Sequence, residues 1–162
     1  MNLALRFKST DGLIGERLVG ARDTWTRIAA GRIAPRREEI TPALLRNVLP
    51  WIWIVDVMDG GADFRFRLAG DRVIQFMGRR YAGSLLSEHL KGAFFHRMKV
   101  LFTECARQRS PIAVGPEQTN MPGKEFLEIE VIALPLSEDG ETVSGLFGAI
   151  DLRALIAPAG GR

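Results

Sequence analysis

The sequence has few of the side chains that build disulfides and metal centres. It contains one cysteine, Cys105, and two histidines, His89 and His96, in 162 residues. A single cysteine can form neither an intrachain disulfide nor a thiolate cage around a metal ion. The histidines lack the His-x-x-x-His spacing of helical metal ligands, and no carboxylate cluster accompanies them. The sequence therefore predicts no metal site.

A long apolar run is also missing. No stretch approaches the roughly 20 consecutive apolar residues that a membrane-spanning helix needs. Residues 1–14 are interrupted by Arg6, Lys8 and Asp11, which is unlike the apolar centre of a signal peptide. We therefore expect a cytoplasmic protein without membrane contact. The length and the apolar content of 46% are ordinary for one globular domain.

Lysine is scarce, and the surplus of positive charge is small. Of the 22 basic residues, 18 are arginine and 4 are lysine, and with 19 acids the formal net charge is +3. A surplus spread along the whole chain does not specify a nucleic-acid site. A weak nucleic-acid binder stays the second alternative, and the residues it would use are Arg32, Arg36, Arg37, Arg79 and Arg80. Glu38 and Glu39 lie beside the first three, which favours a solvated, self-neutralising segment.

A β-hairpin is the clearest structure that the sequence predicts. Residues 52–58 form an apolar run of β-branched and aromatic residues that carries one acid. Residues 59–62 supply turn chemistry, because glycine reaches positive φ without steric cost. Residues 63–69 then alternate as a half-buried strand does. One face of this strand carries Phe64, Phe66 and Leu68, and the other carries Arg65 and Arg67.

Helical patterns lie on both sides of the hairpin. Residues 16–30 form an amphipathic helix with Trp25 on its apolar face, and residues 92–109 form the longest helix. Two shorter helices are expected. One covers 43–48, after Thr41-Pro42, and the other includes residues 73–77, with Asp71 as its candidate N-cap and Gly78 at its end. Three further strands are expected over residues 112–119, 125–136 and 143–152, and the first of these is expected to be an edge strand. Residues 1–14 are expected to be a weakly ordered lead-in.

This order predicts an α+β fold with an antiparallel sheet. The strands carry apolar residues on both faces, so one face can bind the long helix and the other the helix of Trp25. We divide the chain into an N-terminal helix and linker over residues 1–40, a core over 41–153 and a flexible tail over 154–162.

The same order of elements resembles a PAS domain. The sequence is similar over residues 18–152 to a PAS-like family described mainly from alphaproteobacteria and formerly catalogued as a domain of unknown function. It departs from the family pattern at Asp71, where a small hydroxyl residue is usual, and at Arg79-Arg80, where an acid is usual. The residues that carry the resemblance are Trp25, Gly31-Arg32, Pro35, Arg37, Ile40, Leu49-Pro50, Asp56, Phe64, Arg67-Leu68-Ala69-Gly70, Gly78, Gly83, Pro135-Leu136-Ser137 and Asp139-Gly140.

The resemblance implies a five-stranded antiparallel sheet whose flanking helices enclose a small pocket. It implies a sensory or regulatory module rather than an enzyme. PAS domains often dimerise through a helix outside the core, and we expect a homodimer, with Trp25 as the candidate interface residue. No effector domain is expected in the remaining residues, so the module would act through a protein partner or by dimer rearrangement.

Candidate site residues follow from the aromatic side chains and from one acid. A small apolar ligand, if one binds, would contact aromatic side chains, with orientation from a few polar groups. The candidates are Trp53, Phe66, Phe76, Phe95, Phe102 and Phe147. Asp56 is expected to pair with Arg67 across the hairpin. Glu128 and Glu130 share a strand face without a nucleophile nearby, and Arg65 is their expected partner.

The cofactor is not identified by the sequence. Haem is not favoured, because His96 lies off the centre of the apolar face of its helix. A flavin adduct is not favoured, because the Asn-Cys-Arg-Phe-Leu-Gln segment of such photosensors is absent and Cys105 fits a small core position. The first alternative function is an enzyme or ligand carrier on a cone-shaped α+β fold. Such folds begin with long helices, whereas here a hairpin precedes the long helix.

Overall fold

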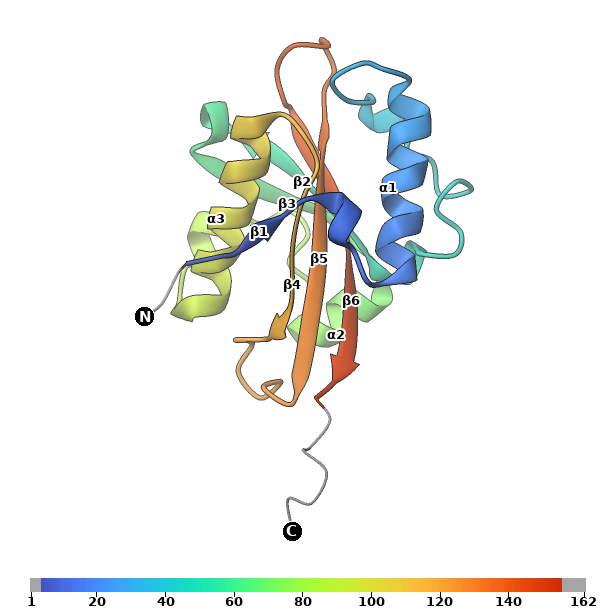
Figure 1. Ribbon diagram of the computed structural model, residues 1–162. Helices are drawn as coiled ribbons and strands as arrows, with labels where there is room; N and C mark the ends of the chain where they lie inside the picture. Colours follow the sequence, from blue (N-terminus) through green and yellow to red (C-terminus); the bar gives the residue numbers. More distant parts are fainter. Residues whose placement is uncertain (1–3, 156–162) are drawn as a thin grey trace.

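Six antiparallel strands form one sheet with helices on both faces (Figure 1). The computed structural model describes residues 4–155. The strands lie in the order β1-β4-β5-β6-β2-β3. They are β1 (Phe7–Lys8), β2 (Ile52–Met58), β3 (Asp63–Ala69), β4 (Ile112–Gln118), β5 (Leu127–Leu136) and β6 (Gly145–Ala154). The described α-helices are α1 (Glu16–Ala29), α2 (Asp71–Met77) and α3 (Gly92–Gln108).

The sheet separates two hydrophobic clusters. Helix α1 covers one face, where Leu18, Ala21 and Trp25 pack against inward residues of β5 and β6. Helices α2 and α3 cover the other face, where Phe76 and Phe102 pack against the hairpin and the long strands. Figure 1 shows α1 and α3 on opposite sides of the sheet. The α+β fold with a helix on each face is therefore as the sequence predicts.

The hairpin has the predicted bounds but an irregular register. Ile54 pairs with Leu68 and Val55 pairs with Phe66, so Arg67 is the extra residue of a β-bulge. The bulge interrupts the alternation of β3: Phe66 is buried, whereas Leu68 is 42% exposed. Leu68 is therefore not buried as Phe64 and Phe66 are, which the simple alternation does not predict.

The N-terminal segment is ordered, which corrects the expectation for residues 4–14. Phe7 pairs with Val114 and Lys8 with Ala113, so β1 adds a sixth strand to the five that were expected. Strand β4 is therefore not an edge strand along its first residues. It bulges between Val114 and Glu117, around a cis Gly115-Pro116 bond, and continues beside β5.

Two local predictions near the hairpin are also wrong. The segment after Thr41 forms successive turns rather than a helix: the N–H groups of Leu44, Leu45 and Val48 donate to carbonyls three residues earlier. Pro50 follows, and it has no N–H with which a helix could continue. Gly70, not Asp71, is the N-cap of α2. A side chain at Gly70 would collide with the backbone of residues 49 and 50, so this position needs glycine for close chain approach. Most of the predicted tail, 154–162, lies outside the described residues.

Candidate functional site

An apolar cavity of about 120 Å³ lies between the sheet and helices α2 and α3. Its walls come from the inward faces of β2, β3, β5 and β6 and from the facing sides of the two helices. The alternation of the strands explains this lining, because every second residue points toward α3. The apolar lining residues include Trp53, Val55, Phe66, Val73, Phe76, Tyr81, Met98, Leu101, Phe102, Val131 and Ile150.

Four of the six aromatic candidates line this cavity. Trp53 and Phe102 contact each other with ring centroids 4.9 Å apart. Phe66 on β3 and Phe76 on α2 complete the aromatic part of the wall. These residues come from four different elements that the fold brings together. Their role in binding a ligand stays a prediction.

Phe95 and Phe147 lie elsewhere. Phe147 is fully buried under α1, on the opposite face of the sheet. It is three residues from Ile150, which lines the cavity, and an odd spacing along a strand reverses the face. Phe95 packs beside the cavity, with its ring centroid 5.5 Å from Tyr81 and 6.0 Å from His89.

Sequence reasoning missed several lining residues. In β5, Leu127, Ile129 and Val131 alternate with acids and pack on the cavity side, so the period-two pattern of a strand could have identified Val131. Leu5 was not, because it belongs to the lead-in whose order the sequence pattern did not predict. Leu5 reaches the cavity because β1 is paired with β4 beside it.

The charged side chains at the cavity have close partners. Arg97 on α3 forms an ion pair with Glu117 on β4 at 2.5 Å, and it donates a second hydrogen bond to the carbonyl of Ala4 at 2.9 Å. The guanidinium of Arg79 lies 4.8 Å from the centre of the Tyr81 ring. These contacts leave an apolar interior with a charged rim.

The predicted pair of Asp56 and Arg67 is present. Arg67 Nε lies 3.1 Å from Asp56 Oδ2, with the two side chains 49% and 25% exposed respectively. At this exposure the pair adds little to stability. Arg65 does not pair with Glu128 or Glu130 as expected, and instead donates to the carbonyl of Gly83 at 2.8 Å.

The carboxylates of β5 have partners on other elements. Glu130 is bound by Lys8 at 2.5 Å and by the backbone N–H of Gly15 at 2.7 Å. Arg153 on β6 lies 4.0 Å from Glu128 and 3.8 Å from Glu130. Arg153 on the paired strand β6 and Lys8 in the N-terminal segment neutralise these carboxylates, so Arg65 is not needed as their partner.

Trp25 packs its helix onto the sheet. Its side chain is 7% exposed, and its indole N–H donates to the carbonyl of Pro135 at 2.8 Å. A side chain buried within its own chain has almost no surface left for a second subunit. Burial of this side chain argues against the prediction that Trp25 is an interface residue.

The histidines and the cysteine have local roles. His89 Nε2 lies 2.8 Å from Ser84 Oγ, and its ring packs edge-on against Tyr81 at 4.7 Å. Burial raises the pKa of the Cys105 thiol, which keeps it protonated and unreactive. His96 is half-buried on α3. Within residues 4–155, no group of three or more histidine, cysteine or acidic side chains is placed to hold a metal ion.

None of the helices in the described part of the chain has the length and hydropathy needed to cross a lipid bilayer.

Comparison with known proteins gives two matches and one negative result. The model of a family described as "PAS domain" matches residues 16–151. A solved structure, the PAS domain from Bordetella pertussis BvgS, is similar with a TM-score of 0.55 and 16% sequence identity, over 76% of this chain and 89% of that chain. A search of the curated proteins found no match.

Proposed function

The chain belongs to the PAS domain family, and from this premise we propose that it is a sensory module that binds a small apolar ligand. PAS domains are generally sensory or regulatory modules rather than enzymes. The ligand would occupy the cavity between the sheet and helices α2 and α3. The observation that carries this proposal is that a cavity with aromatic walls lies on the face of the sheet that α2 and α3 cover.

The size of the cavity limits the ligand. At about 120 Å³ it is smaller than the roughly 300–1,000 Å³ of sites for drug-sized molecules. An engineered apolar cavity of roughly 150 Å³ accepts benzene. We therefore infer a ligand of about one ring, bound mainly through apolar contact. Orientation would come from the rim, where Arg97 and Glu117 lie.

The lining favours binding over catalysis. Among the described lining residues there is no histidine, cysteine or aspartate, and Glu117 is engaged by Arg97. Without histidine, cysteine or aspartate, the described lining lacks the commonest general bases and nucleophiles. It supports a non-enzymatic module over the enzyme alternative. The output would pass through a protein partner or a homodimer, and the cytoplasmic location stays a prediction.

The nucleic-acid alternative is less well supported. Arg32 forms a bidentate pair with Glu39, and its guanidinium lowers the pKa of that carboxyl to about 2. Arg36 pairs with Glu38 and Glu39. Cations already neutralised by neighbouring acids give little of the counterion release that drives phosphate binding.

Benzene titration followed by methyl NMR tests the ligand proposal. We expect the methyl signals of Leu101 and Ile150 to shift saturably, since both side chains line the cavity. Val131→Phe should abolish the shifts by filling the cavity, and Val19→Phe on α1 is the control that should keep them. Unchanged methyl signals in the wild-type protein at saturating benzene would refute the proposal. Native mass spectrometry of the fresh protein then reports any co-purified ligand and the oligomeric state.

A further inference from the structure

The N-terminal residues 4–15, here called the strap, connect the cavity to helix α1. The strap begins beside the cavity, where Leu5 belongs to the lining and Arg97 holds the carbonyl of Ala4. It ends at Gly15, the N-cap of α1 on the opposite face of the sheet. Figure 1 shows the chain running from beside α3 through β1, the edge strand, to the start of α1.

The middle of the strap is held by few main-chain contacts. Strand β1 has two residues, and it pairs with β4 only at Val114 and Ala113. A strand this short contributes little stability by itself. Most of the strap's attachment therefore depends on its side-chain contacts.

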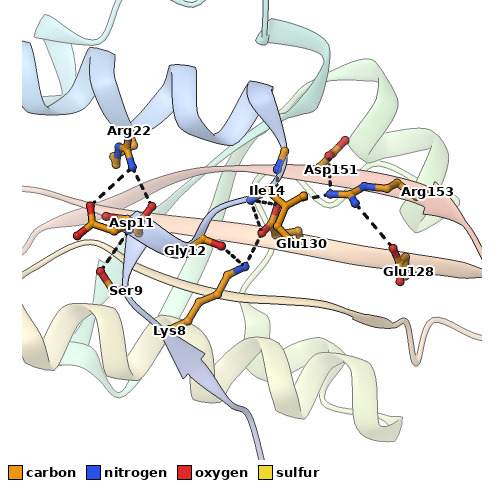
Figure 2. Close-up of polar contacts among 12 residues, drawn as sticks. Lys8, Ser9, Asp11, Gly12, Ile14, Arg22, Glu128, Glu130, Asp151 and Arg153 are labelled. Atoms are coloured by element: carbon orange, nitrogen blue, oxygen red, sulfur yellow. Dashed lines mark hydrogen bonds and ion pairs between the residues drawn. The ribbon is translucent and has the colours of Figure 1, made fainter.

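One buried carboxylate anchors the far end of the strap. Glu130 is 1% exposed, and its carboxylate accepts hydrogen bonds from Lys8 Nζ at 2.5 Å, Ile14 N at 3.0 Å and Gly15 N at 2.7 Å. Lys8 also donates to the carbonyl of Gly12 at 2.9 Å. Figure 2 shows Lys8 and Ile14 converging on Glu130. We call these contacts the latch.

The latch joins two parts of the strap that are separate in sequence. Lys8 belongs to the strand beside the cavity, and the N–H groups of Ile14 and Gly15 lead directly into α1. A buried carboxylate that loses one partner is left under-solvated, which weakens the whole arrangement. Movement of β1 away from β4 therefore disturbs the same carboxylate that fixes the start of α1.

We propose that the strap is a gate over the cavity and that its latch at Glu130 transmits opening of the gate to the start of α1. The gating part rests on the ligand function proposed above. The transmission part does not, because it concerns contacts within the ligand-free protein. The element that moves is the strap, and the element that receives the change is the first turn of α1.

Hydrogen exchange on the ligand-free protein tests transmission. In Leu5→Ala, which alters only the cavity end, we expect faster exchange at the Ile14 and Gly15 amides. Lys8→Met removes the cation that is hydrogen-bonded to Glu130. We expect exchange at the same amides to be at least about tenfold faster, the ratio that corresponds to losing one hydrogen bond to a charged group. Amides in the centre of β5 and β6 serve as internal references for global stability.

Arg107→Met, which removes the exposed pair with Glu104 on α3, is the matched control and should leave the Ile14 and Gly15 amides unchanged. Transmission is refuted if Leu5→Ala leaves these two amides at the wild-type rate. It is refuted equally if every amide, including those of β5 and β6, speeds up by the same factor.

Benzene exchange kinetics test the gate. If the strap closes the cavity, Lys8→Met should raise the rates at which benzene enters and leaves by the same factor. The affinity for benzene should stay unchanged, because only the barrier to its passage is lowered. Rates equal to those of the wild-type protein would show that benzene enters by another route and would refute the gate. Absence of any benzene binding overturns the ligand proposal and, with it, the gate; the exchange experiment on the ligand-free protein still decides transmission.

Discussion

At the scale of single residues, burial and hydrogen bonding act on Glu130 in opposite directions. Burial alone would raise the pKa of this carboxyl, but Lys8 and the N–H groups of Gly15 and Ile14 outweigh it, and the pKa is lowered from its usual value. The carboxylate is therefore ionised at neutral pH although almost no solvent reaches it. Its hydrogen-bond donors, Lys8, Ile14 and Gly15, belong to the strap, so the charge stabilises the strap more than the centre of the sheet.

Acid should weaken the fold partly through Glu130. A carboxyl whose pKa is lower in the folded than in the unfolded state adds stability above the unfolded value, and that stability is lost as pH falls through the folded value. We expect the free energy of unfolding in urea to fall less steeply between neutral and acidic pH in Glu130→Gln than in the wild-type protein. Glu141→Gln, at an exposed turn position, is the control and should follow the wild-type curve. Identical pH dependence in the wild type and Glu130→Gln would contradict this account.

Gly148 should tolerate no side chain. It faces Trp53 on β2 in the sheet register, and a Cβ there would collide with the Trp53 ring and with the carbonyl of Ile132. Overpacking of this kind costs about 1–3 kcal/mol, so Gly148→Ala should lower the free energy of unfolding by about 2 kcal/mol. Gly20→Ala is the control: nothing lies near its Cβ on α1, and removing a helical glycine should stabilise the protein by about 0.5 kcal/mol. Urea unfolding measures both, and a neutral Gly148→Ala would mean that the Trp53 ring moves freely.

At the scale of elements, local pattern decided what could be predicted. Strands β2 and β3 have the predicted bounds, because the apolar run, the Asp-Gly-Gly-Ala turn and the alternation of Phe64 and Phe66 all lie within a few residues. Strand β1 has two residues and so has no period to detect. Residues 43–48 have a helical composition, but Pro50 follows within two residues and the backbone bonds that form there join residues three apart, as in a turn.

The same limit applies to the candidate site. Trp53, Phe66, Phe76 and Phe102 were predicted from residue type, and the fold brings them to one cavity. Residue type alone cannot place Phe147, because its face depends on the register of β6 against β5 and β2. Nor does composition show that Leu5, far away in sequence, reaches the same cavity.

Trp25 should matter for the packing of α1 and not for assembly. Its indole N–H donates to Pro135 O, and a buried hydrogen bond of this kind contributes about 1 kcal/mol. Trp25→Phe keeps a six-membered aromatic ring and removes the five-membered ring with its donor N–H, so we expect a loss of about 1–2 kcal/mol in urea unfolding. The mass by light scattering should be unchanged. Thr26→Ala, at an exposed position on the same helix, is the control for assembly. A change in the oligomeric state of Trp25→Phe alone would restore the interface role that its burial argues against.

At the scale of the whole molecule, the sheet divides the chain into two layers with different uses. The layer under α1 is a filled core in which Phe147, Leu134 and Leu136 are fully or almost fully buried. The layer under α2 and α3 contains the cavity. The strap lies along the edge between them and contacts both. Removing an aromatic ring from either layer should therefore cost similar stability but open different spaces.

Phe102→Ala and Phe147→Ala separate the two layers. Each should lower the free energy of unfolding by about 3–5 kcal/mol, the usual cost of deleting a buried ring. The ring centroid of Phe102 lies 4.9 Å from that of Trp53 and 5.3 Å from that of Phe64. Because Phe102 lines the cavity, its removal enlarges the existing space. Phe147 lies on the α1 side, and its removal leaves a separate void of about one ring. We therefore expect naphthalene, followed by methyl NMR, to bind Phe102→Ala and to bind neither the wild type nor Phe147→Ala. Equal binding of naphthalene to both variants would mean that the two layers are not separate compartments.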